Sequence, residues 1–210
     1  MSASVIADRP TFLQRASRYV RRSACWSSLS PAAPAVRPKL EFGTGSVQSD
    51  ELPLLRRLVE QANARPGPII EIGTLFGMTT LHFMRWKTPE KRILTVDNYC
   101  WNPCGFTPAE HLALTSAVLT MPCELGEIQL VRQSKDEFYR DYRGQTPALV
   151  FLDADHTYAA TRDDLEWARG TGCELICGHD YAVEFPGVTR AVDEAGGTLD
   201  RCGTVWQLRI

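Results

Sequence analysis

The chain has 210 residues, of which 44% are hydrophobic and 23% are charged. This length suits one well-packed domain, and the composition excludes a disordered, collagen-like or coiled-coil protein. No apolar run approaches the ~20 residues of a membrane-spanning helix, and a net charge of −2 gives no reason to expect nucleic-acid binding.

The charge is unevenly distributed along the chain. Residues 1–40 carry seven basic residues and one acid, or +6, which leaves 16 basic and 24 acidic residues in 41–210, or −8. We therefore divide the chain into a basic N-terminal arm or linker, 1–40, and an acidic domain, 41–210. The arm suits a segment that packs on the domain or on a second copy of the chain, which we favour, or an organelle transit peptide. Seven scattered cysteines are typical of a cytoplasmic protein with reduced thiols.

Beyond residue 46, helix-like segments alternate with apolar, strand-like runs. Apolar residues on one face predict a first helix that reaches Gln61 and that Ser49 or Asp50 caps. Strands are predicted at 68–73, 92–97, 128–131, 148–153, 174–178, 197–200 and 205–209, and further helices near 77–86, 108–121, 135–142, 158–169 and 187–195. This alternation predicts an α/β fold, with a doubly wound, mostly parallel sheet that carries helices on both faces.

The turn after the first strand has the sequence EIGTLFGMTT. Gly73 and Gly77 allow a tight turn and a close approach of the backbone to a ligand. Their G-x3-G spacing differs from the G-x-G-x2-G of dinucleotide sites, and the neighbouring carboxylate of Glu71 favours a ligand with a cationic end. Asp97 ends the next strand, where an acid that binds ribose hydroxyls is expected. The pattern predicts a nucleoside-containing, positively charged cofactor.

Four segments, EIGTLFG, ILTVD, FLDADHTY and GHDY, occur in this order. They resemble the motifs of class I S-adenosylmethionine-dependent methyltransferases, and most closely a small-molecule O-methyltransferase-like group with D-x-D-H-x-Y and H-D-Y motifs. The resemblance covers roughly 45–210 and implies a seven-stranded Rossmann-like sheet. It also implies that S-adenosyl-L-methionine is the cofactor and that the cofactor-binding residues are Glu71, Gly73, Thr74, Gly77 and Thr79 at the methionine part, Asp97 at the ribose with Asn98 beside it, and Ser134 at the adenine.

Transfer of a methyl group to oxygen requires an activated hydroxyl, because an alcohol or phenol is mostly protonated at neutral pH. A general base or a divalent metal can supply this activation. His156 is the candidate base, three residues after the strand-end carboxylate of Asp153. In the related catechol-type enzymes a lysine occupies this position, so the resemblance is one of role. A histidine that only caps the next helix is the alternative.

The catechol-type pattern also implies a metal site. By that resemblance Asp153, His179 and Asp180 would hold the ion, with His179 in the place of an acid. Oxygen ligands suit magnesium, and the histidine shifts the preference toward manganese, iron or zinc. Without a metal, Asp153 would orient the amine of the cofactor, and His179 with Asp180 would be a base and its orienting acid.

Other functions stay open at this stage. The segment FLDADHT also fits the motif of haloacid-dehalogenase-type phosphatases. Those proteins carry the motif on their first strand and need a later lysine, whereas here no lysine follows Lys135. A nicotinamide-dependent oxidoreductase and a non-catalytic nucleoside-binding protein are the two main alternatives. The expected acceptor is a small hydroxylated molecule such as a sugar, a phenol or a natural product. The loop with Trp101 and Phe106, together with His111, suits either an acceptor wall or simple packing over the sheet.

Overall fold

The computed structural model describes residues 47–210, so the predicted arm at 1–40 lies outside the described residues. Its strands are β1 (Ile69–Ile72), β2 (Ile93–Asp97), β3 (Ile128–Arg132), β4 (Leu149–Leu152), β5 (Ile176–Gly178), β6 (Thr198–Cys202) and β7 (Val205–Leu208). Its helices are α2 (Leu52–Asn63), α3 (Met78–Trp86), α4 (Pro108–Val118), α5 (Thr120–Glu124), α6 (Lys135–Asp141), α7 (Tyr158–Gly170) and α8 (Pro186–Glu194). Within this part of the chain, no helix is long and apolar enough to cross a membrane.

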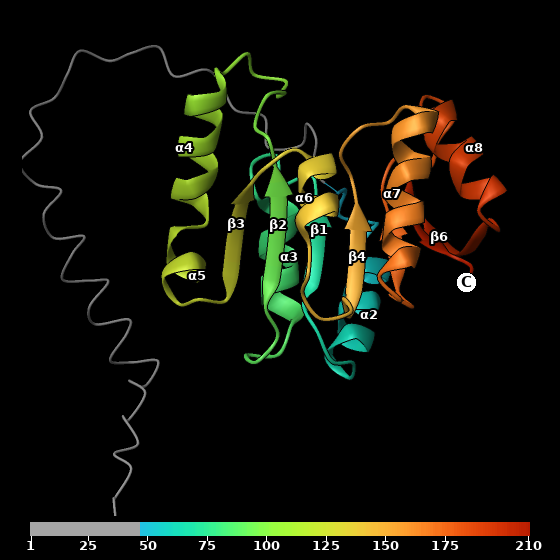
Figure 1. Ribbon diagram of the computed structural model, residues 1–210, viewed down its shortest axis with the longest axis horizontal. Coiled ribbons are helices and arrows are strands. Elements are labelled where there is room, and N and C mark those ends of the chain that lie inside the picture. Colours follow the sequence, from blue (N-terminus) through green and yellow to red (C-terminus); the bar gives the residue numbers. More distant parts are fainter. Residues whose placement is uncertain (1–46) are drawn as a thin grey trace, which may run out of the picture. The chain divides into compact units, whose positions relative to one another are not determined.

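The seven strands form one sheet in the order β3-β2-β1-β4-β5-β7-β6 (Figure 1). Strands β1 to β5 are parallel, and β7 pairs antiparallel with both β5 and β6. The predicted α/β class with a mostly parallel seven-stranded sheet is confirmed. The chain builds outward from β1 to β3 and then returns to β4, so the strand order reverses between β1 and β4. Ligands bind at such a switch point, beyond the carboxyl ends of the strands.

Helices cover both faces of the sheet, with α6 and α7 in front and α2 and α3 behind in Figure 1. Side chains of a strand alternate between the faces. Ile70 and Ile72 of β1 therefore pack with the core residues of α6, α7 and α8, whereas Ile69 packs with those of α2 and α3. Glu71 shares the face of Ile69, and its carboxyl group lies beneath α3, where the Thr80 hydroxyl donates to it.

Two predicted helix boundaries are wrong, each for a local reason. The single helix expected at 108–121 ends at Val118, and a separate short helix begins at Thr120. Pro122 explains the break, because its ring clashes with the carbonyl of the residue four positions earlier in a helix. At the start of α2, Glu51 and not Ser49 or Asp50 occupies the N-cap position, and its side chain makes no capping hydrogen bond.

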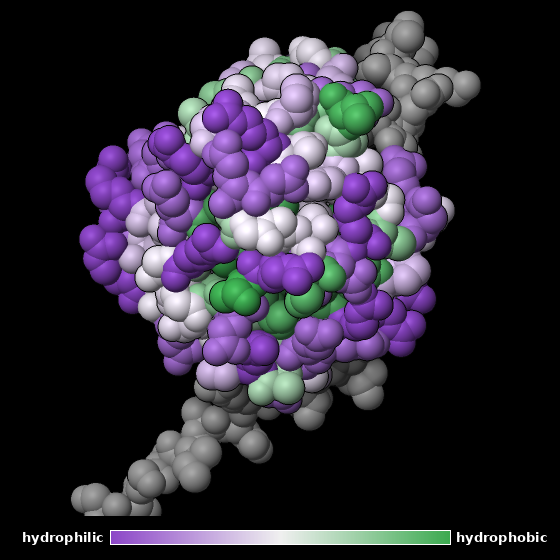
Figure 2. Space-filling view, turned by 90° about the vertical axis from the view of Figure 1, so that its right-hand side faces the viewer, coloured by the Kyte–Doolittle hydropathy of each residue, from purple (hydrophilic) through white to green (hydrophobic). Residues whose placement is uncertain are grey.

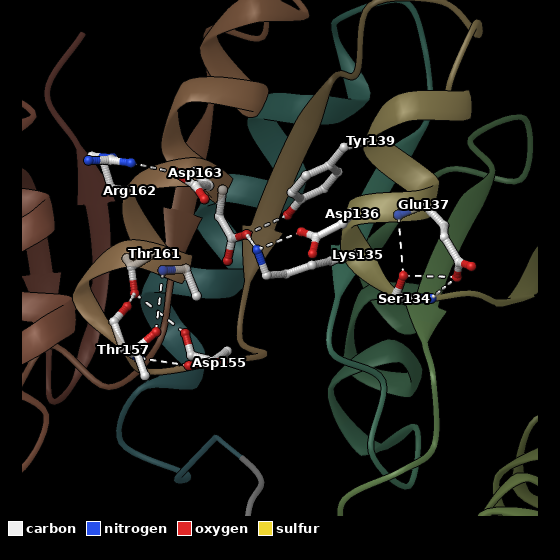
Figure 3. Close-up of polar contacts among 12 residues, drawn as sticks. Ser134, Lys135, Asp136, Glu137, Tyr139, Asp155, Thr157, Thr161, Arg162 and Asp163 are labelled. Carbon is white, nitrogen blue, oxygen red and sulfur yellow. Dashed lines mark hydrogen bonds and ion pairs between the residues drawn. The ribbon is translucent and has the colours of Figure 1, made fainter.

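A buried ion pair joins α6 to α7 on the front of the sheet (Figure 3). Lys135 Nζ lies 2.8 Å from Asp164 Oδ1, and the Tyr139 hydroxyl donates to the same carboxylate at 2.9 Å. The Tyr139 ring also stacks on Trp167, with centroids 4.2 Å apart. Ser134 begins α6 through a reciprocal capping box with Glu137. These contacts fix the start of α6 at the carboxyl edge of the sheet.

Candidate active site

The turn between β1 and α3 passes close to the end of β4. Gly73 has φ +99°, and a Cβ atom there would lie 1.9 Å from the backbone oxygen of Asp153. A side chain at this position is therefore incompatible with the fold. Gly77 has φ +80° and forms the N-cap of α3, as the tight turn predicted from the sequence requires. The glycine turn and the strand-end aspartate consequently lie side by side at the switch point.

Asp97 is held by three backbone N–H groups. Its Oδ2 accepts hydrogen bonds from the amides of Thr74 at 3.0 Å and Leu75 at 2.9 Å, and its Oδ1 accepts one from Tyr99 at 2.7 Å. Hydrogen bonds of this kind to a carboxylate are strong and directional. They bring the acid at the end of β2 against the glycine turn. Asn98 is exposed beside it, and its Oδ1 accepts a hydrogen bond from the Cys100 amide.

Glu71 is fully buried, and its charge is not available at the turn. Its Oε2 accepts hydrogen bonds from the hydroxyls of Thr80 and Thr95, both at 2.5 Å, and its Oε1 has no partner among the described residues. Burial raises the pKa of Glu71 to about 8, so the group is mostly neutral at pH 7. In the ligand-free protein the carboxyl group therefore carries little negative charge at pH 7. Thr74 and Thr79 are buried as well, and the Thr74 hydroxyl lies 2.6 Å from that of Thr95.

Three polar side chains converge beyond β4 and β5. His156 Nε2 lies 2.8 Å from Asp180 Oδ2 and 3.7 Å from Asp153 Oδ1. One ligand atom from each of these residues falls within 4.8 Å of the others. Asp180 has φ +60°, and the ring of Phe185 packs against His156 with centroids 4.7 Å apart. We call Asp153, His156 and Asp180 the carboxylate–histidine centre.

The two carboxylates favour the charged form of His156. Asp153 and Asp180 together outweigh the burial of the ring and raise the pKa of His156 to about 10. The same pairing holds the pKa of Asp180 well below its usual range, although burial alone would raise it. His156 Nε2 makes no hydrogen bond of good geometry among the described residues, despite the short distance to Asp180. The nitrogen is thus buried between the two carboxylates.

His179 lies on the other side of the same carboxylates. Its Nδ1 is 3.4 Å from Asp180 Oδ1 and 3.8 Å from Asp153 Oδ1, and its Nε2 is 3.1 Å from Glu51 Oε2. Burial opposes the charged form of the ring, but the neighbouring carboxylates outweigh it and raise the pKa of His179 to about 9. His179 therefore links Glu51 to the carboxylate–histidine centre.

Glu51 is a residue of the site that the sequence analysis missed. Its side chain is buried, and it accepts hydrogen bonds from the Gln48 amide and from the amide and hydroxyl of Thr204. Burial disfavours its ionised form, but these hydrogen bonds outweigh burial and lower the pKa of Glu51. A Cβ atom on Gly203 would lie 2.5 Å from Glu51 Oε1, so the glycine in the β6–β7 turn leaves the room that the carboxylate occupies. Nothing in the sequence connects position 51 to positions 179 and 204.

The carboxylate–histidine centre fits a divalent cation. Two carboxylate oxygens and one imidazole nitrogen form a mixed oxygen and nitrogen donor set of the kind that manganese, iron and zinc accept. The predicted ligands Asp153 and Asp180 belong to this group. His156 supplies its nitrogen donor. The predicted ligand His179 is not part of this group, because its Nε2 faces Glu51 and its Nδ1 lies 3.4 Å from Asp180 Oδ1.

A groove of about 800 Å³ opens on the α8 side of the molecule, between the segment after Asp180 and the β6–β7 turn. Tyr181, Arg201 and Thr204 line it, and the guanidinium of Arg201 lies 4.9 Å from the centre of the Tyr181 ring. Figure 2 shows this end of the molecule, where apolar side chains gather in the middle of a polar face. Tyr181 follows Asp180 directly in the chain, but no residue of the carboxylate–histidine centre lines the groove.

No family model and no curated protein matches this sequence. Solved structures do match the fold. The O-methyltransferase of Bacillus cereus in complex with SAH is 14% identical with a TM-score of 0.60, over 98% of this chain and 94% of that one. TomG of Streptomyces achromogenes, an O-methyltransferase of tomaymycin synthesis in complex with SAM, is 14% identical with a TM-score of 0.60, over 97% and 92%. CalS11, a TDP-rhamnose 3′-O-methyltransferase of calicheamicin biosynthesis, is 18% identical with a TM-score of 0.57, over 97% and 96%. These similarities show that the chain shares their fold.

The buried acid Glu71 gives the protein a pH-dependent stability. The folded protein keeps the proton up to pH about 8, whereas a carboxyl group with the ordinary value of 4.5 releases it in the unfolded chain. Glu71 should therefore lower the free energy of unfolding as pH rises between these values, by at most about 1.4 kcal/mol per pH unit. Above pH 6.5 His156 and His179 add slopes of the same sign, because their pKa values are raised from 6.5 to about 10 and about 9. Glu71→Gln should therefore remove the slope in urea titrations from pH 5 to 6.5. Glu60→Gln, at an exposed position of α2, is the control, and a slope unchanged by Glu71→Gln would show that another group causes it.

Proposed function

We propose that the protein is an S-adenosylmethionine-dependent methyltransferase that methylates a hydroxyl group of a small molecule. The observation that carries the proposal is the contact between Gly73 and Asp153, which sets the glycine turn beside the carboxylate–histidine centre. A nucleoside-type site on β1 and β2 thus adjoins a proton-accepting site on β4 and β5. The fold supports this, because TomG is named an O-methyltransferase in complex with SAM and the B. cereus enzyme one in complex with SAH.

The cofactor would lie along the carboxyl edge from β2 to β4. Asp97 would bind the ribose hydroxyls through the lone pairs that the three backbone amides leave free, with Asn98 next to it. The methionine part would be lined by Glu71, Gly73, Thr74, Gly77 and Thr79. Ser134, which begins α6, would border the adenine. Asp153 would receive the amine of the methionine part in the metal-free state.

The carboxylate–histidine centre would accept the proton of the acceptor. S-adenosylmethionine would supply the methyl group and a sulfonium leaving group that keeps the C–S electron pair on sulfur. As the C–O bond formed, the hydroxyl proton would move to a neutral His156. Asp153 and Asp180 then stabilise the resulting imidazolium. Because the sulfonium is already a good leaving group, the other task of the site is to align the reactants and exclude water. His179 and Asp180 form a second, more buried candidate base and its orienting acid.

A divalent cation at Asp153, His156 and Asp180 would lower the pKa of the acceptor hydroxyl and neutralise the two carboxylates. The groove beside Tyr181 is our proposed entry for the acceptor, since it adjoins the residue after Asp180. Because CalS11 is named a TDP-rhamnose 3′-O-methyltransferase, sugars are one class of acceptor to screen, together with phenols and natural-product hydroxyls.

Cofactor binding separates this proposal from a nicotinamide-dependent oxidoreductase. In thermal shift, S-adenosylhomocysteine and S-adenosylmethionine should stabilise the protein, whereas NAD and NADP should not. Asp97→Asn should weaken S-adenosylhomocysteine binding about ten- to a hundredfold in calorimetry, because it removes a charged acceptor. Asp136→Asn, on the exposed side of α6, should leave the affinity unchanged. Stabilisation by NAD or NADP alone would overturn the proposal.

The pH dependence of methyl transfer tests His156 as the base. With its pKa raised to about 10, His156 is mostly protonated at pH 7, so the turnover of the metal-free protein should increase with pH toward about 10. Adding Mn²⁺ should shift this increase to lower pH, because a cation held by His156 and the two carboxylates would replace the histidine as the activating group and lower the pKa of the acceptor hydroxyl itself. His156→Gln should lower kcat about a hundredfold or more, and His82→Gln on α3 is the control. Near wild-type turnover of His156→Gln would remove His156 as the base.

A further inference from the structure

Helix α4 holds the glycine turn by its backbone. The carbonyl oxygen of Leu75 accepts two hydrogen bonds, one from His111 Nε2 at 2.9 Å and one from the Thr115 hydroxyl at 2.6 Å. Both donors are fully buried and lie one helical turn apart on α4, 36 and 40 residues beyond Leu75 in the chain. Two side chains of one helix therefore converge on a single carbonyl group of the turn.

The conformation of Leu75 explains why such an anchor is needed. Leu75 has φ +47°, in the left-handed region that residues with a Cβ atom rarely adopt. A residue keeps such a conformation only where its surroundings enforce it, and strained positions of this kind gather at functional sites. The two hydrogen bonds from α4 fix the carbonyl of Leu75 in the orientation that this φ produces.

The opposite side of the same turn carries the contact with Asp97. The amides of Thr74 and Leu75 donate to Asp97 Oδ2, while the carbonyl of Leu75 points at α4. The turn is thus held between a carboxylate on β2 and two donors on α4. Releasing the carbonyl would allow the peptide unit between Leu75 and Phe76 to rotate, and this would loosen the turn whose Thr74 and Leu75 amides orient Asp97.

Aromatic packing joins the loop before α4 to the same place. The ring of His111 makes edge contacts with Tyr99 and Phe76, at centroid distances of 5.2 and 5.1 Å, and Phe76 also contacts Phe106 at 6.3 Å. Within the described residues, His111 Nδ1 and the Tyr99 hydroxyl are buried without a hydrogen-bond partner. Burying such atoms is unfavourable. The hydrogen bond of His111 to Leu75 offsets part of this cost, which explains a polar ring inside an aromatic cluster.

We propose that His111 and Thr115 are positioning residues for the cofactor: they hold the Leu75 carbonyl so that the turn keeps Asp97 oriented toward the ribose. The inference rests on the proposed function for the identity of the ligand. The arrangement of the turn itself belongs to the ligand-free protein, so it is measurable without any cofactor.

The test compares Thr115→Val, which removes the hydroxyl at nearly constant volume, with Thr115→Ser, which retains it. In calorimetry with S-adenosylhomocysteine, Thr115→Val should bind about three- to tenfold more weakly, the effect of losing one hydrogen bond, and Thr115→Ser should recover most of the loss. Thr120→Val is the matched control, because the Thr120 hydroxyl also donates to a helix carbonyl but does not contact the turn.

Hydrogen exchange of the ligand-free variants provides the second readout. The amides of Thr74 and Leu75 should exchange faster in Thr115→Val than in the wild type, while that of Val150 in β4 should not change. Wild-type affinity together with wild-type exchange in Thr115→Val would overturn the inference, as would weaker binding that Thr115→Ser does not recover. If the wild type does not bind S-adenosylhomocysteine, the proposed function fails, and the exchange rates alone decide whether α4 holds the turn.

Discussion

The close approach of Gly73 to the backbone of Asp153 is the constraint on which the rest of the site depends. β1 and β4 are neighbours at the switch point of the sheet, and a side chain at Gly73 would overlap the Asp153 carbonyl. This contact brings the glycine turn and Asp97 from one half of the sheet against the carboxylate–histidine centre of the other half. A cofactor held by the first half would therefore lie next to the groups that we propose as proton acceptors in the second.

Alternating charges organise the second half of the site. Acidic and imidazole side chains alternate across the carboxyl ends of β4 and β5, in the order Glu51, His179, the Asp153 and Asp180 pair, and His156. Each imidazole lies between carboxylates, which keeps both rings protonated in the free protein. The free protein thus has its carboxylates neutralised by protonated histidines, and a bound cation would change which of these nitrogens carries a proton.

Much of the fold and part of the site follow from the sequence, because they depend on local patterns. The strand positions, the turn at Gly73 and Gly77, and the place of Asp97 follow from periodicity, glycine chemistry and the geometry of parallel sheets. Contacts between distant segments do not leave such a local pattern: the bond of Glu51 to His179 and that of His111 to Leu75 depend on tertiary packing. The raised pKa of Glu71 does not follow from a local pattern either, because it depends on burial of the carboxyl group beneath α3.

A crystal structure of the protein with bound S-adenosylhomocysteine tests the central claim most directly. We predict that the ribose hydroxyls contact the Asp97 carboxylate and that the sulfur faces the carboxylate–histidine centre, with the Leu75 carbonyl still hydrogen-bonded to α4. A ligand seated elsewhere, for example in the groove beside Tyr181, or a ribose bound without any contact to Asp97, would contradict it.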